Sequence, residues 1–347
     1  MHTLIPFTAD TCRQLVAKRE GETKIGQTLH CYEGKAPLGE HLAKAKADGV
    51  RFVILGIGED IGPRANLGRG GAVDAFEAVM AQFCNFQSNQ FLDGSLCLVL
   101  GQIATQDLQL PADATTQTLR DNVEKLDQRV IDIVTAIIAA ELEPIVIGGG
   151  HNNAYGLLMA TKAATKRPVA AVNLDPHSDF RPREGRHSGN GFSYAAASGA
   201  LAHYHVLGMH ELKNSQQTLE QLAAFGGKWH TFQSIWVRQE LTLKQAISDI
   251  VIDLNASGLP VAIELDLDAI INMPSSASTS AGIPLIDALF YVNQVARNTN
   301  ACYLHLAEGA PSCHPAGIEA GRRETGQSIS ELIYSYIQGR TAQHPLG

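Results

Sequence analysis

The sequence predicts an α/β fold with a mostly parallel sheet that helices cover on both faces. From residue 144 onward, short apolar runs typical of buried strands alternate with longer stretches of helical periodicity. This order needs crossover connections, which make successive strands parallel and place helices on both faces of the sheet. No linker-like stretch interrupts the pattern, so residues 1–347 are expected to form a single domain.

The elements can be assigned in order along the chain. Residues 1–49 are polar and irregular, apart from a helix expected at residues 38–47. About eight strands are expected, at residues 51–58, 96–101, 144–147, 169–174, 203–207, 229–232, 261–267 and 302–306. The other helices are expected at residues 72–82, 118–142, 155–164, 215–225, 241–256, 285–297 and 326–338. In such sheets ligands bind at the carboxyl ends of the strands.

Composition and charge exclude several classes of function. The chain is 45% hydrophobic and 18% charged, and no basic stripe offsets its net charge of -8, which argues against nucleic acid as a partner. Apolar runs such as residues 134–140 are too short to span a bilayer, and no signal peptide is visible. The 6 cysteines form no Cys-x-x-Cys pair. Reduced thiols are therefore expected, as in a cytoplasmic protein.

The strongest chemical signal follows the strand expected at residues 169–174. Asp175, His177 and Asp179 alternate, so all three begin on one face as that strand ends. Two carboxylates and an imidazole at one edge form a metal-binding group. Their oxygen-rich character favours a hard ion such as manganese.

Two other strand ends offer further ligands. His151 follows three glycines after one strand, and Asp266 and Asp268 close another. Each alone is ambiguous: the glycines can serve a tight turn around a packed histidine, and the two aspartates can cap a helix or bind magnesium. Together with the first motif they are hard to explain without a metal site.

The four aspartates of this set indicate how many cations are needed. Two carboxylates about 4 Å apart repel by roughly 4 kcal/mol at an effective dielectric constant near 20. Four converging anions would bind protons or move apart without compensation. Two divalent cations balance them and one does not, so the sequence predicts a binuclear site.

A glycine-rich loop at residues 62–71 carries Arg64 and Arg69. Glycines allow close backbone approach to a ligand, and arginines suit an anion. Taken alone, the segment is better explained as a surface loop whose arginines pair with acidic neighbours. Its spacing differs from the dinucleotide fingerprint, so no nicotinamide cofactor is expected.

Together these motifs resemble those of the arginase–agmatinase–formimidoylglutamase family, the ureohydrolases. The family's GG-x-H, D-x-H-x-D and D-x-D motifs match residues 148–151, 175–179 and 266–268 in type, order and spacing. The resemblance extends from about residue 62 to the last helix. It implies a three-layer, arginase-like α/β/α fold and two manganese ions per subunit.

The resemblance also assigns the ligands and a reaction. It implies that His151 and Asp179 bind one ion and that His177 and Asp268 bind the other. It also implies that Asp175 and Asp266 bridge the two ions. Two cations bring the pKa of a shared water near neutrality, and this water attacks an amidinium or guanidinium carbon. Asp179 is expected to carry its proton to the leaving amine, with His187 as the alternative.

Other residues are implied to bind the substrate. Glu308 matches the family's glutamate that recognises the cationic end of the substrate; a helix-capping or surface glutamate is the alternative. The segment with Ser188 and Asn190 resembles the loop that binds the substrate carboxylate. Within it, Phe192 falls where arginases place a proton-shuttling histidine.

Three features resemble the formimidoylglutamase branch rather than arginase: Arg181, the loop at residues 62–71, and Pro274-Ser-Ser-Ala277. N-formimidoyl-L-glutamate carries two carboxylates and an amidinium, and Arg181, with Arg69 or Arg64, can bind carboxylates through forked hydrogen bonds. Hydrolysis to L-glutamate and formamide, a step of histidine degradation, is therefore the first expectation.

Several alternatives stay open. One is an arginase, agmatinase or other guanidino-acid hydrolase that releases urea, and another is a non-catalytic scaffold of the same shape. Magnesium phosphotransfer through Asp266 and Asp268 is disfavoured because no phosphate-binding loop motif is present. The family suggests a homo-oligomer that acts on a small molecule.

Overall fold

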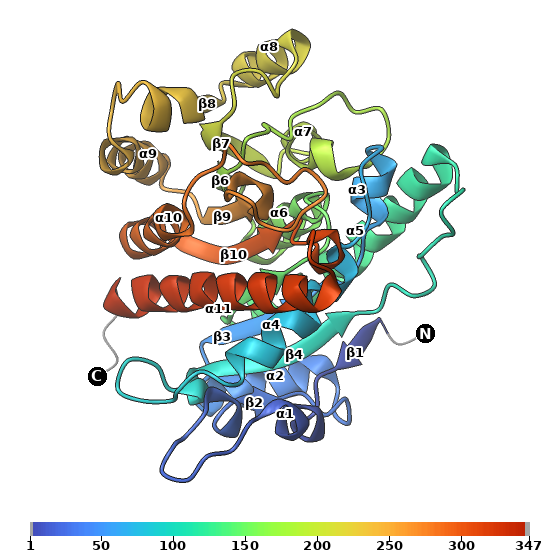
Figure 1. The fold of residues 1–347 in the computed structure, drawn as a ribbon, viewed down its shortest axis with the longest axis vertical. Coiled ribbons are helices and arrows are strands. Elements are labelled where there is room, and N and C mark those ends of the chain that lie inside the picture. Colours follow the sequence, from blue (N-terminus) through green and yellow to red (C-terminus); the bar gives the residue numbers. More distant parts are fainter. Residues whose placement is uncertain (1–2, 344–347) are drawn as a thin grey trace.

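A computed structural model describes residues 3–343 and contains a 10-stranded sheet (Figure 1). The strands lie in the order β1-β4-β3-β5-β10-β9-β6-β7-β8, and β2 pairs with β4. Only β1 is antiparallel to its neighbour among the pairs in this sheet. The strands are β1 (Leu4–Pro6), β2 (His30–Cys31), β3 (Phe52–Gly56), β4 (Cys97–Ile103), β5 (Glu143–Ile147), β6 (Val169–Leu174), β7 (Leu201–Met209), β8 (Lys228–Thr231), β9 (Val261–Asp266) and β10 (Ala301–Ala307).

Helices connect most of these strands. They are α1 (Ala9–Leu15), α2 (Leu38–Ala47), α3 (Ile61–Ala65), α4 (Ala75–Phe83), α5 (Thr116–Ala139), α6 (Asn153–Thr165), α7 (Gly191–Ala197), α8 (Gln216–Phe225), α9 (Leu243–Ser257), α10 (Leu285–Asn298) and α11 (Ile318–Gln343). Several begin at capping residues: the hydroxyls of Thr115, Ser215 and Thr242 each accept a hydrogen bond from the backbone N–H three residues later. None of the helices described is both long and apolar enough to cross a membrane.

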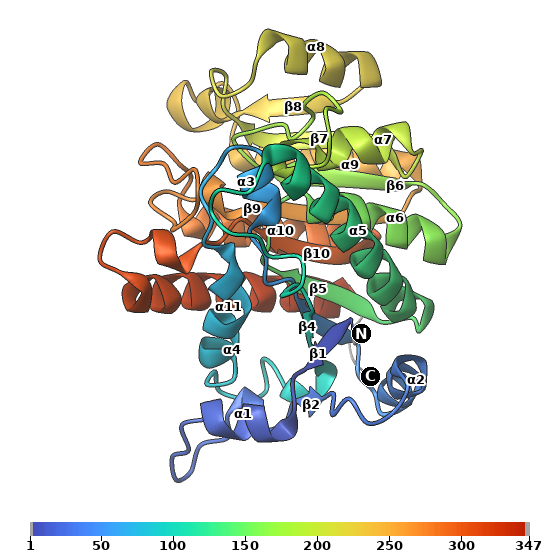
Figure 2. The ribbon, with the colours of Figure 1, turned by 90° about the vertical axis from the view of Figure 1, so that its right-hand side faces the viewer.

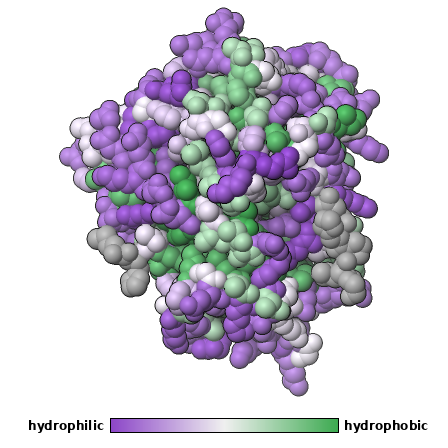
Figure 3. Space-filling model, turned by 180° about the vertical axis from the view of Figure 1, so that it is seen from behind, coloured by the Kyte–Doolittle hydropathy of each residue, from purple (hydrophilic) through white to green (hydrophobic). Residues whose placement is uncertain are grey.

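The sheet is the middle of three layers, as expected (Figure 2). Alternate strand residues face opposite layers, so Ile54 and Ile263 belong to one hydrophobic core and Val53 and Ala262 to the other. The first core packs against α4, α9, α10 and α11, and the second against α2, α5, α6, α7 and α8. Seen from behind, the surface is mostly hydrophilic, with apolar residues gathered in its central part (Figure 3).

The structure differs from the sequence prediction at both ends of the chain. The first 49 residues are not irregular, because β1, α1 and β2 precede α2, and the two strands raise the number in the sheet from about eight to ten. Such short strands have too few residues to show an alternating pattern. Helix α11 begins at Ile318, well before the expected residue 326. Gly321 and Gly326 have low helix propensity, so the sequence does not indicate a helix there. In the structure they allow close packing against Pro311 and Ala78.

Candidate metal centre

The predicted metal ligands lie at the carboxyl ends of adjacent parallel strands. In the sheet, β5, β10, β9 and β6 are consecutive neighbours. His151 follows β5, Asp175 follows β6, Asp266 ends β9, and Glu308 follows β10. Because neighbouring strands are only about 4.8 Å apart, side chains that are distant in sequence meet at this edge.

One group of ligands surrounds His151. Gly148 and Gly149 have φ values of 80° and 73°, a left-handed turn that favours glycine and brings His151 over the end of the sheet. The imidazole is fully buried, and its Nδ1 faces three carboxylates. Nδ1 lies 3.3 Å from Asp175 Oδ2, 3.1 Å from Asp179 Oδ2 and 3.4 Å from Asp266 Oδ2.

A second group adjoins the first and shares Asp175 with it. His177 Nδ1 lies 3.4 Å from Asp175 Oδ1 and 3.3 Å from Asp268 Oδ2. The possible ligand atoms of this group, like those of the first, lie within 4.8 Å of one another. The structure therefore brings all six predicted ligands together as two overlapping groups.

The motif spacing also holds Asp175, which belongs to both groups, and Asp266, which belongs to the first, in place. Asp175 Oδ1 accepts a hydrogen bond of 2.6 Å from the His177 backbone N–H. Asp266 Oδ1 accepts one of 2.8 Å from the Asp268 backbone N–H. Asn173 Nδ2 donates to the other oxygen of Asp175 at 2.9 Å. These bonds fix both carboxylates before any ion binds.

The donors fit divalent cations. His151 Nδ1 and Asp268 Oδ1 are buried and have no hydrogen-bond partner within the described structure. An orphaned buried polar atom is costly unless a ligand satisfies it. Carboxylate oxygens and imidazole nitrogens are donors that manganese accepts.

Burial and mutual repulsion raise the pKa of two of the crowded carboxylates, whereas the histidines lower that of Asp175 despite its burial. Burial raises the pKa of Asp179 to about 6, and the charge of Asp175 adds to this effect. Burial, with Asp268 and Asp175, also raises the pKa of Asp266 well above its usual value. Burial lowers the pKa of His151, but the surrounding carboxylates raise it well above its usual value overall. Cations that bind here must displace protons.

Glu308 lies beside this cluster and lines the pocket. Its Oε1 accepts a hydrogen bond of 3.0 Å from the His151 backbone N–H. Glu308 and Asp179 have φ values of 64° and 46°, which are rare for residues other than glycine and occur preferentially at functional sites. Burial, with Asp268 and Asp179, raises the pKa of Glu308 to about 8. A cationic substrate group would favour its ionised form.

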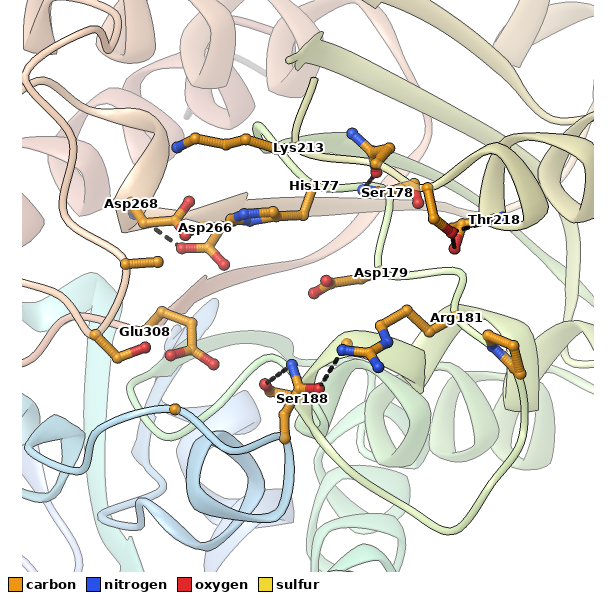
Figure 4. Close-up of a pocket in the computed structure, with 18 of the residues that line it drawn as sticks. His177, Ser178, Asp179, Arg181, Ser188, Lys213, Thr218, Asp266, Asp268 and Glu308 are labelled. Atoms are coloured by element: carbon orange, nitrogen blue, oxygen red, sulfur yellow. Dashed lines mark hydrogen bonds and ion pairs between the residues drawn. The ribbon is translucent and has the colours of Figure 1, made fainter. Parts of the chain in front are cut away.

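The cluster opens into a pocket of about 510 Å³. Figure 4 shows the carboxylates of Asp179, Asp266, Asp268 and Glu308 around its floor. Arg181 and Lys213 lie on different sides of His177 and Asp179 in this view. The pocket therefore combines an acidic floor with cationic side chains on its walls.

Arg181 and Ser188 reach the pocket, as the sequence predicted. The Arg181 side chain is 48% exposed, and its Nη1 donates to Asn66 Oδ1 at 2.8 Å. Asn66 Nδ2 in turn donates to the Ser188 hydroxyl at 3.3 Å. Asn66 thus links the glycine-rich loop to the wall that carries Arg181.

Lys213 is a pocket residue that the sequence analysis missed. It lies on the loop after β7, which is held against the D-x-H-x-D loop by Asn214. Asn214 Oδ1 accepts from the Ser178 backbone N–H at 2.8 Å, and its Nδ2 donates to the Pro176 carbonyl at 3.1 Å. The only sequence signal for Lys213 is its position after a strand.

Asn190 has a different place from the one predicted. It is fully buried and absent from the pocket wall. Its Oδ1 accepts from Arg186 Nη1 at 2.9 Å and from the His187 backbone N–H at 3.1 Å. Its Nδ2 donates to the carbonyls of Pro182 and Gly185. These bonds use the amide inside its own loop, so Asn190 shapes the loop rather than facing a ligand.

Other predicted candidates also lie away from the pocket wall. Arg69 is exposed and donates to the Ser276 carbonyl at 3.3 Å. Arg64 Nη1 donates to the Leu110 carbonyl at 2.8 Å. His187 is fully buried, and burial with nearby Arg181 lowers its pKa to about 3, which disfavours it as a proton donor. Phe192 packs edge-on against the His151 ring, with centroids 5.3 Å apart.

Comparison with known proteins extends the likeness beyond the motifs. The Arginase family model matches residues 50–337. Formimidoylglutamases of Streptococcus pyogenes, serotypes M3 and M49 among them, are 32% identical over 178 residues, which cover 48% of this chain and 49% of theirs. The chain thus spans about half the length of the curated relatives that it matches.

Two solved structures share the fold at low sequence identity. Formimidoylglutamase from Bacillus subtilis has a TM-score of 0.74 and 17% identity, with 93% of each chain covered. Trypanosoma cruzi formiminoglutamase with Mn2+ has a TM-score of 0.71 and 18% identity, with 92% of this chain and 98% of that chain covered. The family match over most of the chain confirms the resemblance seen in the motifs, and the chain belongs to the arginase family.

Proposed function

We propose that this protein is a binuclear manganese hydrolase that cleaves a C–N bond of a linear amidine. The convergence of the six ligands, with the orphaned Nδ1 of His151 facing three carboxylates, carries the proposal. Two cations balance the four aspartates there, whereas one would leave them short of positive charge. The similar Trypanosoma cruzi protein, which was solved with Mn2+, supports manganese.

His151 and Asp179 would hold one ion, His177 and Asp268 the other, and Asp175 and Asp266 both. The bound ions would bring the pKa of a water near neutrality and so supply the nucleophile. Glu308, on the pocket wall, would hold the cationic amidinium by a charge-assisted hydrogen bond.

Asp179 would carry the proton from the water to the leaving amine. Its carboxylate reaches both the His151 imidazole and the pocket, which are the two places that this role requires. His187 is buried away from the pocket wall, and burial with nearby Arg181 lowers its pKa to about 3, so Asp179 is the better candidate.

We further propose that the substrate is N-formimidoyl-L-glutamate, which would yield L-glutamate and formamide. Its amidinium suits the acidic floor, and its two carboxylates suit the cationic walls with Arg181 and Lys213. Agmatine has no carboxylate and would offer neither Arg181 nor Lys213 a substrate group to bind. The names of the matched relatives agree with this choice. A homo-oligomeric state and a cytoplasmic location stay predictions.

Product analysis tests the proposal. Metal-depleted protein is reconstituted with Mn2+ and offered N-formimidoyl-L-glutamate, arginine, agmatine and short guanidino acids. We expect formamide and glutamate from the first compound at a rate well above that of urea release from the others. Faster urea release would identify a guanidino-acid hydrolase instead. A manganese-loaded protein that cleaves none of them would contradict catalysis altogether.

A further inference from the structure

A fully buried carboxylate lies on the protein side of the metal centre, and the proposed reaction does not use it. Glu264 belongs to β9 and precedes Asp266 by two residues, so it projects from the same face of the strand. It lies opposite His305 on β10 and Asn173 on β6 in the register of the sheet. The strand order, rather than any local pattern, brings these polar residues together.

Two strong hydrogen bonds hold this carboxylate in place. Tyr303 Oη donates to Glu264 Oε1 at 2.6 Å. His305 Nδ1 lies 2.6 Å from Glu264 Oε2 and serves as the donor to it. All three side chains are fully buried. An unpaired carboxylate at such a position would be very costly, so these donors account for its presence in the core.

The same Oε2 faces the rear of the metal-binding histidine. His151 Nδ1 faces the three aspartates, while its Nε2 lies 3.4 Å from Glu264 Oε2. Phe192 and His305 pack edge-on against the ring, with centroid distances of 5.3 and 5.7 Å. A neutral imidazole that offers the Nδ1 lone pair to a cation carries its proton on Nε2. That proton needs an acceptor. His151 Nε2 is buried without a hydrogen-bond partner in the described structure, and Glu264 Oε2, at 3.4 Å, is the carboxylate oxygen that faces it.

We infer that Glu264, held by Tyr303 and His305, is a positioning residue that orients His151 and keeps Nδ1 free for the cation. The inference rests on the proposed metal centre and adds a residue outside its ligand set. Carboxylates behind metal-binding histidines fix the tautomer and the ring orientation, and their loss typically weakens metal binding by about 10–100-fold.

The atoms of His151, Glu264 and His305 are also close enough to hold a third ion. The hydrogen bond to His305 argues against this, because Glu264 Oε2, the oxygen that faces both histidines, already accepts from His305 Nδ1 at 2.6 Å and an ion would have to replace that contact. The two interpretations differ in metal stoichiometry, with two ions per chain for a positioning residue and three for a cation site.

The test compares manganese binding by metal-depleted protein and its Glu264→Gln variant, using calorimetric titration. Glutamine has the size of glutamate but only one oxygen, which cannot serve both Tyr303 and the two histidines. We expect one of the two ions to bind about 10–100-fold more weakly. Electron paramagnetic resonance at two equivalents should show single-ion signals in place of the coupled pair.

Glu143→Gln is a matched control. Glu143 is also largely buried and pairs with Arg51 and Arg340, but it lies at the amino end of β5, away from the site. This variant should lower the melting temperature and leave manganese affinity within about twofold. A fall in affinity for Glu264→Gln no greater than that of the control would overturn the inference.

The Tyr303→Phe variant tests the role of Glu264 if Glu264→Gln fails to fold. It removes one of the two bonds that hold the carboxylate, so a smaller loss of manganese affinity is expected, and an unchanged affinity would overturn the inference. Three ions bound to the unmodified protein would also overturn it. An unmodified protein that binds no manganese would refute the proposed metal centre itself, whereas normal binding by Glu264→Gln refutes only the role of Glu264.

Discussion

The floor and the walls of the pocket are built in different ways. On the floor, the side chains of Asp266 and Asp268 are 4% exposed and that of Asp179 is 10% exposed, and all three lie at or after strand ends. On the wall, the side chain of Arg181 is 48% exposed and lies on a loop. These floor carboxylates are largely enclosed, whereas the Arg181 side chain is open to water.

This difference separates the chemistry from the choice of substrate. Buried side chains at strand ends are fixed by the sheet, and the low dielectric around them strengthens their charges. Water screens the charge of a loop side chain such as Arg181. A neighbour such as Asn66 also uses part of its hydrogen-bonding capacity. Substitutions on the floor should therefore have much larger effects than those on the walls.

The largest effect is expected for Asp175→Asn. Asp175 is shared by both ligand groups, and its replacement removes a charge from each. We expect kcat to fall by about 10³-fold or more, equivalent to at least ~4 kcal/mol. Mass spectrometry should find fewer than two manganese ions per chain. Turnover near that of the unmodified protein would show that Asp175 does not bridge.

Manganese should stabilise the fold more as pH rises. In the metal-free protein, burial raises the pKa of Asp179 to about 6 and that of Glu308 to about 8, and carboxylates raise the pKa of His151 and His177 despite burial. Groups with raised pKa bind protons more tightly in the folded state, so their stabilisation is lost as pH rises from about 5 to 8.

Cations replace those protons, so affinity should rise about tenfold per pH unit for each proton displaced. Melting curves with and without Mn2+ between pH 5 and 8 measure the effect. We expect the gap between the two melting temperatures to widen with pH. A constant gap would mean that manganese binds away from these groups.

Arg181→Ala should have a moderate effect. Because the guanidinium is about half exposed, its loss should raise KM for N-formimidoyl-L-glutamate by about tenfold, or ~1.4 kcal/mol, and leave kcat nearly unchanged. Arg181→Lys keeps the charge but loses the forked geometry, so it should recover only part of the affinity. An unchanged KM in Arg181→Ala would remove this residue from the substrate site.

Lys213→Met should raise KM for the same substrate by about threefold to tenfold. The ammonium is a point charge without the paired geometry of a guanidinium, so each contact is weaker. Substrate analogues that lack one carboxylate identify the carboxylate that Lys213 binds. The variant and the unmodified protein should bind the analogue without that carboxylate equally well. Equal losses for every analogue would indicate that Lys213 acts on the metal cluster instead.

The smallest effect is expected for Arg69→Ala. Arg69 is exposed and does not line the pocket, although it donates to the carbonyl of Ser276, which does. KM and kcat should change by less than about twofold, as is usual for exposed charges. A tenfold rise in KM would return Arg69 to the substrate site.

The sequence by itself predicted the acidic and histidine residues that meet at this edge of the sheet, because their motifs follow expected strands. Only Asp266 lies within a strand: residues 175–179 follow β6, and Asp268 lies in a short 3-10 helix after β9. Each motif follows an apolar run that reads as a buried strand, so its place at a carboxyl end is a local property. The family match over residues 50–337 agrees with that interpretation.

Only the tertiary structure decided which other side chains meet them. Glu264 contacts His305 because β9 and β10 are neighbours in register, and Lys213 reaches the pocket because Asn214 ties its loop to residues 176–178. The Asn190 side chain turns inward because its Oδ1 accepts a hydrogen bond from Arg186. These outcomes depend on strand order and on contacts between distant segments, which the local periodicity of a sequence does not encode.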